Sequence, residues 1–148
     1  MNRLSGLAGQ GVDIRHCKHE DVDAVLALWS AARSSHASTA DRREDAEALL
    51  EDGPAALLVA EGDGLVVGAV IAGWDGWRGN VYRLAVASEH RRRGIGLRLL
   101  RAAGAYFRDR GAGRVTALVA FDDIAPAAFR DGAGYPRDAE IGRRVRNI

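Results

Sequence analysis

A run of three arginines and two glycines, Arg91-Arg92-Arg93-Gly94-Ile95-Gly96, is the segment whose residue types point most clearly to chemistry. The first amides of an α-helix have no acceptor within the helix, and the helix dipole places about half a positive charge at that end. Glycine lets a ligand approach the backbone closely because it has no Cβ, and arginine adds charge-assisted hydrogen bonds. A helix that begins in this run would therefore bind a phosphate or pyrophosphate group.

The elements on either side of the run are predicted to hold it in place. Residues 81–87 before it are mainly apolar and predict a strand. After it, an apolar residue recurs at every fourth position, at Ile95, Leu99, Ala103 and Phe107, which predicts an amphipathic helix. Gly111 and Gly113 are expected to end this helix. The predicted frame of the anion site is thus a strand, a glycine-containing loop and a helix.

The rest of the chain also alternates between strand and helix patterns. Further strands are predicted at residues 12–16, 56–61, 65–72, 115–119 and 140–148. The turn Gly62-Asp63-Gly64 should join two of them into an antiparallel hairpin. Further helices are predicted from Asp21 onward, at residues 40–50 and, as a short one, at residues 126–129. This order of elements predicts a mixed α/β fold.

Size and charge limit the classes of protein to which the chain can belong. Its 148 residues, of which 47% are hydrophobic, predict a single domain at residues 12–148, after a flexible lead-in at residues 1–11. A formal net charge of +1 argues against nucleic-acid binding, and no apolar stretch is long enough for a membrane span. The single cysteine, Cys17, cannot form an internal disulfide, which suits a reducing compartment. We therefore expect a cytoplasmic protein.

The residues from Arg91 to Gly96 resemble the acyl-coenzyme A signature of the GNAT superfamily of N-acetyltransferases. That signature reads glutamine or arginine, two variable residues, glycine, a variable residue, then glycine or alanine. The preceding Leu84-Ala85-Val86 strand and the following helix fit the same family, and Gly134-Tyr135 resembles its late glycine-aromatic pair. The turn at residues 73–79 resembles one found in a branch of small bacterial members. The resemblance implies a single-domain, mostly antiparallel sheet flanked by helices.

The resemblance also implies that acetyl-CoA is the co-substrate and that no metal is needed. The main chain of the Leu84-Ala85-Val86 strand would bind the pantetheine arm, and the arginine loop would bind the pyrophosphate. The set of cofactor-binding residues implied in this way is Leu84, Ala85, Val86, Arg91, Arg92, Arg93, Gly94, Ile95, Gly96, Leu97, Asp123 and Phe129.

The catalytic residues depart from the family pattern. Arg130 stands where many members have a tyrosine acid, and Asn80 stands where some have a glutamate base. Arginine stays protonated near neutral pH, so Arg130 could stabilise a leaving thiolate by charge without donating a proton. Asp75 is then the candidate general base, with His36 second.

Several of these residues also have a purely structural interpretation. For Asp75, the residue types favour a turn-forming role before Gly76 over the catalytic one. The neighbouring Trp77 could line an acceptor pocket or simply cover a hairpin end. Residues 16–19 contain two histidines and Cys17, but no distant fourth ligand completes a zinc site. Cys17 is therefore interpreted as a packing residue.

Together these patterns predict an enzyme that transfers an acetyl or other short acyl group from coenzyme A to a primary amine. The amine would attack directly in a ternary complex, without a covalent enzyme intermediate. A small molecule, a peptide or a protein could supply the amine, and a homodimer is compatible with the pattern. The alternatives are a weak or inactive acyl-CoA-binding module and an interaction protein that mainly dimerises.

Overall fold

The computed structural model describes residues 11–32, 40–51, 53–118, 134–142, 144 and 146. By its internal contacts the chain divides into two compact units, residues 1–118 and residues 119–148. Each unit is described by itself.

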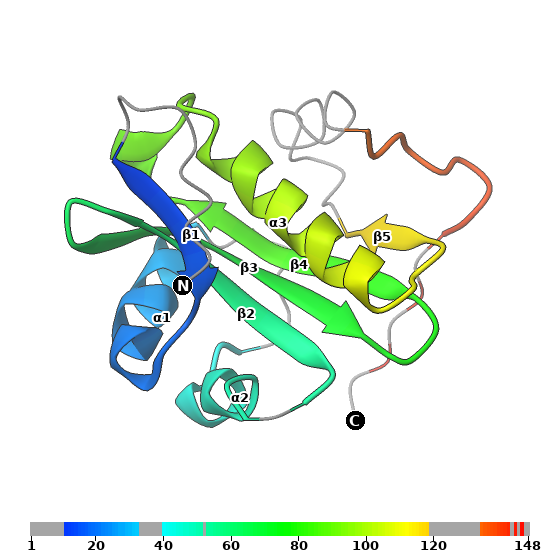
Figure 1. The fold of residues 1–148 in the computed structure, drawn as a ribbon, viewed down its shortest axis with the longest axis horizontal. Coiled ribbons are helices and arrows are strands. Elements are labelled where there is room, and N and C mark those ends of the chain that lie inside the picture. The colour runs from blue at the N-terminus through cyan, green and yellow to red at the C-terminus, as the bar shows by residue number, and fades with distance from the viewer. Residues whose placement is uncertain are drawn as a thin grey trace. The chain divides into compact units, whose positions relative to one another are not determined.

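The described part of the first unit is built on a five-stranded sheet (Figure 1). Its strands are β1 (Val12–His16), β2 (Ala55–Gly62), β3 (Leu65–Trp74), β4 (Gly79–Val86) and β5 (Val115–Ala117). They lie side by side in sequence order, and every neighbouring pair is antiparallel except β4 and β5, which are parallel. The predicted mixed, mostly antiparallel sheet is therefore confirmed.

Helices cover both faces of this sheet. Helix α1 (Val22–Ala31) and the short α2 (Arg43–Ala48) lie on one face, and α3 (Ile95–Asp109) crosses the other (Figure 1). Side chains alternate between the faces of a strand, so β2 and β3 can fill both cores with their apolar residues. The core on the α1 side consists of Cys17, Val22, Val25, Leu28, Trp29, Ala46, Leu57, Val59, Ala69, Ile71 and Ala85.

Local sequence explains the hairpin and the end of the long helix. Asp63 and Gly64 have positive φ angles of 51° and 76°, as a two-residue turn between antiparallel strands requires. Helix α3 ends at Asp109, and Gly111, just past the C-cap residue Arg110, has a φ of 79°. The N–H of Gly111 donates to the Arg108 carbonyl and that of Ala112 to the Phe107 carbonyl, which is a Schellman cap.

Helix α3 approaches the sheet closely because glycines face it. A Cβ on Gly79 of β4 would lie 2.7 Å from two carbons of the Phe107 ring, and one on Gly68 of β3 would lie 3.0 Å from Leu99. Real Cβ contacts are almost never shorter than 3.0 Å. These glycines therefore allow the apolar side chains of α3, the helix that follows the arginine loop, to pack directly against the sheet.

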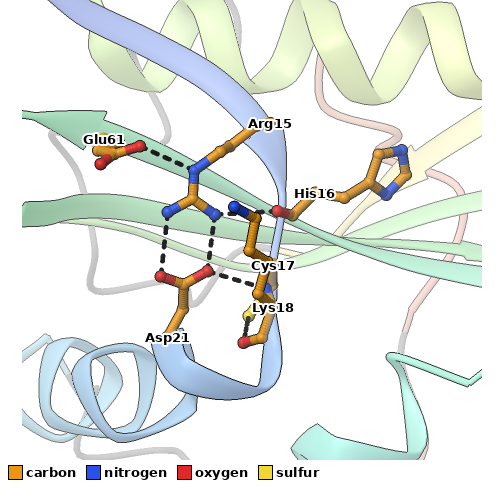
Figure 2. A network of polar contacts seen from close by, with 6 residues as sticks. All are labelled: Arg15, His16, Cys17, Lys18, Asp21 and Glu61. Atoms are coloured by element: carbon orange, nitrogen blue, oxygen red, sulfur yellow. Dashed lines mark hydrogen bonds and ion pairs between the residues drawn. The ribbon is translucent and has the colours of Figure 1, made fainter. Parts of the chain in front are cut away.

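A polar network ties β1 to the start of α1 (Figure 2). The Arg15 guanidinium donates to both carboxylate oxygens of Asp21, at 2.6 and 3.0 Å, and to Glu61 of β2 at 2.8 Å. Asp21 also accepts the backbone N–H of Lys18 at 2.8 Å. Asp21 is buried, and its hydrogen bonds from Arg15 hold the pKa of its carboxyl below the usual value.

Two sequence expectations differ from the structure. Helix α2 spans only Arg43–Ala48, not residues 40–50. Before it, Arg42 has an extended backbone, and after it Leu49 and Leu50 donate their N–H groups three residues back in a tighter final turn. The predicted strand at residues 140–148 is wrong for residues 140–142, 144 and 146, none of which is in a strand. Here the Glu140 N–H donates to the Asp138 side chain at 3.1 Å, which forms a local turn. The predicted lead-in (1–10) and short helix (126–129) lie outside the described residues.

Candidate active site

The arginine loop joins β4 to α3 as predicted. A short 3₁₀ turn, Ser88–His90, follows β4, and α3 begins at Ile95. Arg92 and Gly94 both have left-handed backbone angles, with φ of 62° and 76°. Gly94 occupies the N-cap position of α3, where no side chain caps the helix. The amides of the first turn are therefore presented at a helix end that receives no side-chain cap.

The space and charge at this helix end suit an anion. A Cβ added to Gly94 would meet no heavy atom of the described chain within 4 Å, so the approach to the backbone is open. Arg91, Arg92 and Arg93 are all exposed, and Arg91 Nε donates to the Val86 carbonyl at 3.3 Å. That contact holds Arg91 at the end of β4. The loop thus combines helix amides and guanidinium groups, which is the donor set that a pyrophosphate requires.

Strand β4 carries a β-bulge immediately before this loop. Ala69 pairs with Ala85 and Ile71 with Tyr82, so Arg83 and Leu84 together stand opposite a single residue, Val70. Arg83 has a left-handed φ of 55° at this point. The bulge changes the direction of the main chain just before Leu84.

Among the described residues, β5 pairs with only the first part of the other edge of β4. Its parallel pairing with β5 runs from Gly79 to Val81, and Leu118 adds one bond to the Val81 carbonyl at 3.3 Å. No described strand pairs with this edge from residue 82 to residue 86. Main-chain groups between Leu84 and Val86 that point away from β3 could therefore bind an extended polyamide arm along this edge. The structure brings this edge and the arginine loop together within the first unit.

Asp75 lies in the turn between β3 and β4. Its Oδ1 accepts the backbone N–H groups of Trp77 and Arg78 at 2.8 and 2.7 Å. These bonds lower the pKa of the exposed Asp75 carboxyl below the usual value, which makes it a weaker base. The contacts support the turn-forming interpretation of Asp75. Beside it, Trp77 is 73% exposed and carries the Arg78 guanidinium 4.5 Å from its ring centroid.

The other predicted catalytic positions are only partly described. Asn80 is half-buried in β4, opposite Gly73 of β3 and Thr116 of β5. The remaining candidates, His36, Asp123, Phe129 and Arg130, lie outside the described residues.

Cys17 has the surroundings of a packing residue. It is 7% exposed, and its Sγ donates to the Lys18 carbonyl at 3.4 Å. Burial raises the pKa of the Cys17 thiol to about 11. Only a thiolate is an effective nucleophile, so this thiol is poorly suited to accept an acyl group at neutral pH.

The described residues offer neither a metal-binding cluster nor a membrane-spanning helix. Within the described ranges, no cluster of three or more His, Cys, Asp and Glu side chains could hold a metal ion. No helix in the same ranges is both long and apolar enough to cross a membrane.

Comparison with known proteins agrees with the geometry of the loop and strand. The sequence profile described as "Acetyltransferase (GNAT) family" matches residues 22–135. The chain belongs to this family. An acetyltransferase of Sodalis glossinidius is 33% identical over 137 residues, which cover 90% of this chain and 96% of that protein. The GNAT chain described here is therefore an acyltransferase, and its family uses acetyl-CoA.

Solved GNAT structures share the fold. A putative acetyltransferase from Agrobacterium tumefaciens superposes with a TM-score of 0.77 at 18% identity, covering 91% of this chain and 99% of that one. An aminoglycoside acetyltransferase from an uncultured soil sample, in complex with sisomicin, gives a TM-score of 0.78 at 17% identity over 93% and 97% of the two chains. At these identities the likeness establishes the fold alone.

Sequence reasoning missed one part of the site. Trp29, Asp41 and Arg83 meet at the bulge in β4, although they are far apart in the chain. A left-handed arginine inside a strand has no signature in the sequence. A Trp and an Asp that stabilise it can be recognised only once the fold is known.

Proposed function

We propose that this chain transfers an acetyl or other short acyl group from coenzyme A to a primary amine. One observation carries the proposal. The N-terminus of α3 has no side-chain cap and lies beside three exposed arginines. It follows the bulged strand β4, and no described strand pairs with residues 82–86 on the β5 side of β4. In a GNAT chain this arrangement offers donors for a pyrophosphate and an adjacent main chain for a polyamide arm.

Each segment of the site has a distinct role in binding. The amides of Ile95, Gly96 and Leu97, with the guanidinium groups of Arg91 to Arg93, would hold the pyrophosphate. The main chain of Leu84 to Val86 would hold the pantetheine arm. Asp123 and Phe129 complete the proposed set from outside the described residues. Acetyl-CoA supplies an activated thioester, and this chain orients its carbonyl carbon toward the amine.

The transfer itself needs no covalent enzyme intermediate. The nitrogen lone pair of the neutral amine attacks the thioester carbonyl carbon and the C–N bond forms. The nitrogen, now positively charged, gives up a proton to water, and the C–S bond breaks to leave the amide and the thiolate. The sulfur leaves as a thiolate with an ordinary thiol pKa of about 8.5, which is tolerable near neutral pH. An amine of pKa about 10.4 must first lose a proton to a base or to water. The protonated, buried Cys17 takes no part in this sequence.

Arg130 and Asp75 remain the proposed catalytic residues. Arg130 would stabilise the developing thiolate by charge, so Arg130→Lys should keep more turnover than Arg130→Ala. Equal, unchanged rates in both variants would show that Arg130 takes no part in the reaction.

Asp75 would relay the amine proton through water. Asp75→Asn should then lower turnover at neutral pH without weakening acetyl-CoA binding, and unchanged turnover would leave Asp75 only its turn-forming role.

The acceptor is proposed by chemical class only. One structural neighbour is an aminoglycoside acetyltransferase in complex with sisomicin, and another is in complex with the bisubstrate analogue CoA-S-monomethyl-acetylneamine. A cationic small-molecule amine is therefore the first class to test, followed by lysine-containing peptides. We expect the reaction in the cytoplasm, because a single buried cysteine suits a reducing compartment.

The test is release of coenzyme A thiol from acetyl-CoA with a panel of amines, including sisomicin, spermidine and a lysine peptide. We expect amine-dependent thiol release and an acetylated product whose mass is increased by one acetyl group. Saturable acetyl-CoA binding without turnover for any amine would favour the alternative, an acyl-CoA-binding module. An absence of binding would contradict both functions.

A further inference from the structure

Arg83 combines two features that rarely occur together. It lies inside β4, yet its backbone φ of 55° is in the left-handed region that normally favours glycine. A non-glycine residue keeps such a strained angle only where its surroundings hold it. The strain lies at the β-bulge, one residue before Leu84.

Neighbouring residues contact both the main chain and the side chain of Arg83. Trp29 of α1 donates its indole N–H to the Arg83 carbonyl at 2.9 Å. Asp41 Oδ1 lies 2.7 Å from Arg83 Nη2, and these two side chains are only 11% and 23% exposed. One contact therefore fixes the main chain of the bulge, and the other fixes the side chain. Both come from the part of the chain that lies on the α1 face of the sheet.

Asp41 differs from the acids that follow it. Asp45 pairs with Arg42, and Glu47 pairs with Arg43, on the surface of α2. Exposed pairs of this kind contribute little to structure. Asp41 instead pairs with Arg83 of the sheet, and at 11% exposure its side chain is largely shielded from water, so loss of this pair should cost more than loss of an exposed one. Of these three acids, Asp41 is therefore the one that contacts the bulge, through Arg83.

We propose that Trp29 and Asp41 are positioning residues for acyl transfer, which hold the bulge at Arg83 and so orient the main chain of Leu84. This inference rests on the proposed function. The angles at Arg83 set the direction of the peptide that joins it to Leu84. If the clamp is lost, Arg83 can relax to an ordinary strand angle, and that peptide turns.

The consequence should appear in the rate more than in binding. A displacement of about 1 Å at the reacting centre can slow a reaction up to a hundredfold. The arginine loop and the N-terminus of α3 do not depend on Trp29 or Asp41, so most of the affinity for acetyl-CoA should persist. A positioning role therefore predicts a lower kcat with a nearly unchanged affinity for acetyl-CoA.

The test uses the full chain, acetyl-CoA and the amine with the highest turnover in the panel described above. We expect Asp41→Asn to lower kcat about tenfold or more, while the acetyl-CoA Kd measured by calorimetry changes less than about twofold. Asp41→Glu should recover part of kcat. Asp45→Asn makes the same charge change on an exposed pair, and its kcat should equal that of the parent.

A second comparison distinguishes the effect of backbone strain at Arg83 from a general loss of stability. Glycine adopts the left-handed angle without strain, so Arg83→Gly should retain more activity than Arg83→Ala. Adding Asp41→Asn to Arg83→Gly should change kcat less than about twofold, because the partner of Asp41 is already gone. The Trp29 indole N–H resonance, identified by its loss in Trp29→Phe, should shift in Asp41→Asn.

Two results would overturn the inference while the proposed function stands. One is an active parent whose kcat does not respond to Asp41→Asn. The other is a parallel fall of kcat, acetyl-CoA affinity and melting temperature, which would show that the clamp only stabilises the fold. A parent that acetylates no amine would contradict the proposed function, and this inference would fall with it.

Discussion

At the scale of single residues, surroundings decide which groups can react. Cys17 carries the one thiol of the chain, but burial raises its pKa to about 11, so it stays protonated at neutral pH. Asp75 has its carboxylate turned to two backbone N–H groups of its own turn. Neither residue has the surroundings of an activated nucleophile or of a strong base. The proposed reaction therefore depends on positioning and on the reactivity of the thioester.

Replacement of Cys17 tests direct attack. Cys17→Ala should leave amine acetylation within about tenfold of the parent, because removal of a true nucleophile costs several orders of magnitude. The check is steady-state turnover together with mass spectrometry of the Cys17 peptide after exposure to acetyl-CoA. Recovery of an acetyl-Cys17 peptide, with turnover reduced more than a hundredfold in the variant, would point to a covalent mechanism instead.

At the scale of elements, close packing between α3 and the sheet places the anion site. The stripe from Ile95 to Phe107 lies against Gly68 and Gly79, and this contact determines where the helix end meets β4. The helix and its loop were predictable because their apolar period and glycine caps are local signals. The bulge at Arg83 was not, since its clamp joins residues as many as 54 positions apart in the chain.

Gly79→Ala tests this packing. The added Cβ would lie 2.7 Å from the buried Phe107 ring, and such overpacking should lower the free energy of unfolding by about 1–3 kcal/mol. Urea denaturation measures the change. Gly104→Ala in α3 is the matched control, because its Cβ would meet only Arg108 Nη1 at 3.6 Å and alanine is the better helix former. A Gly79→Ala chain as stable as the parent would show that α3 can shift freely on the sheet.

At the scale of the whole chain, local patterns predicted the α/β class and the mostly antiparallel sheet. They failed at residues 140–142, where Glu140 bonds to the Asp138 side chain and no strand forms. Isolated alternation of apolar and charged residues was not enough to form a strand there. The Arg15, Asp21 and Glu61 network was also missed, because it joins β1, the turn before α1 and β2. Such pairings depend on tertiary structure.

That network should govern acid stability. The folded chain lowers the pKa of Asp21 below its unfolded value of about 3.9, chiefly through Arg15. The resulting stability is complete above the unfolded pKa and is lost as the pH falls through the folded pKa. Asp21→Asn should lower the free energy of unfolding at pH 7 by about 1–3 kcal/mol, as for other charged hydrogen bonds. Between about pH 5 and pH 3 its stability should then fall less steeply than that of the parent.

Circular dichroism during urea titration at several pH values measures both effects. Asp45→Asn is the control, since Asp45 pairs with Arg42 on the exposed surface of α2 and should cost little stability. Equal pH slopes for the parent and Asp21→Asn would contradict the assigned role of this carboxylate.

The proposed function requires that acetyl-CoA binds at the N-terminus of α3, and calorimetry of Gly96→Asp can show whether it does. A carboxylate in the first turn favours the helix itself, so the variant should fold, yet it should repel a pyrophosphate. Gly104→Asp adds the same charge farther along α3, beside Arg108. We predict that the parent and Gly104→Asp bind acetyl-CoA alike and that Gly96→Asp binds at least about tenfold more weakly. Equal affinity in all three chains would show that the pyrophosphate does not bind at this helix end.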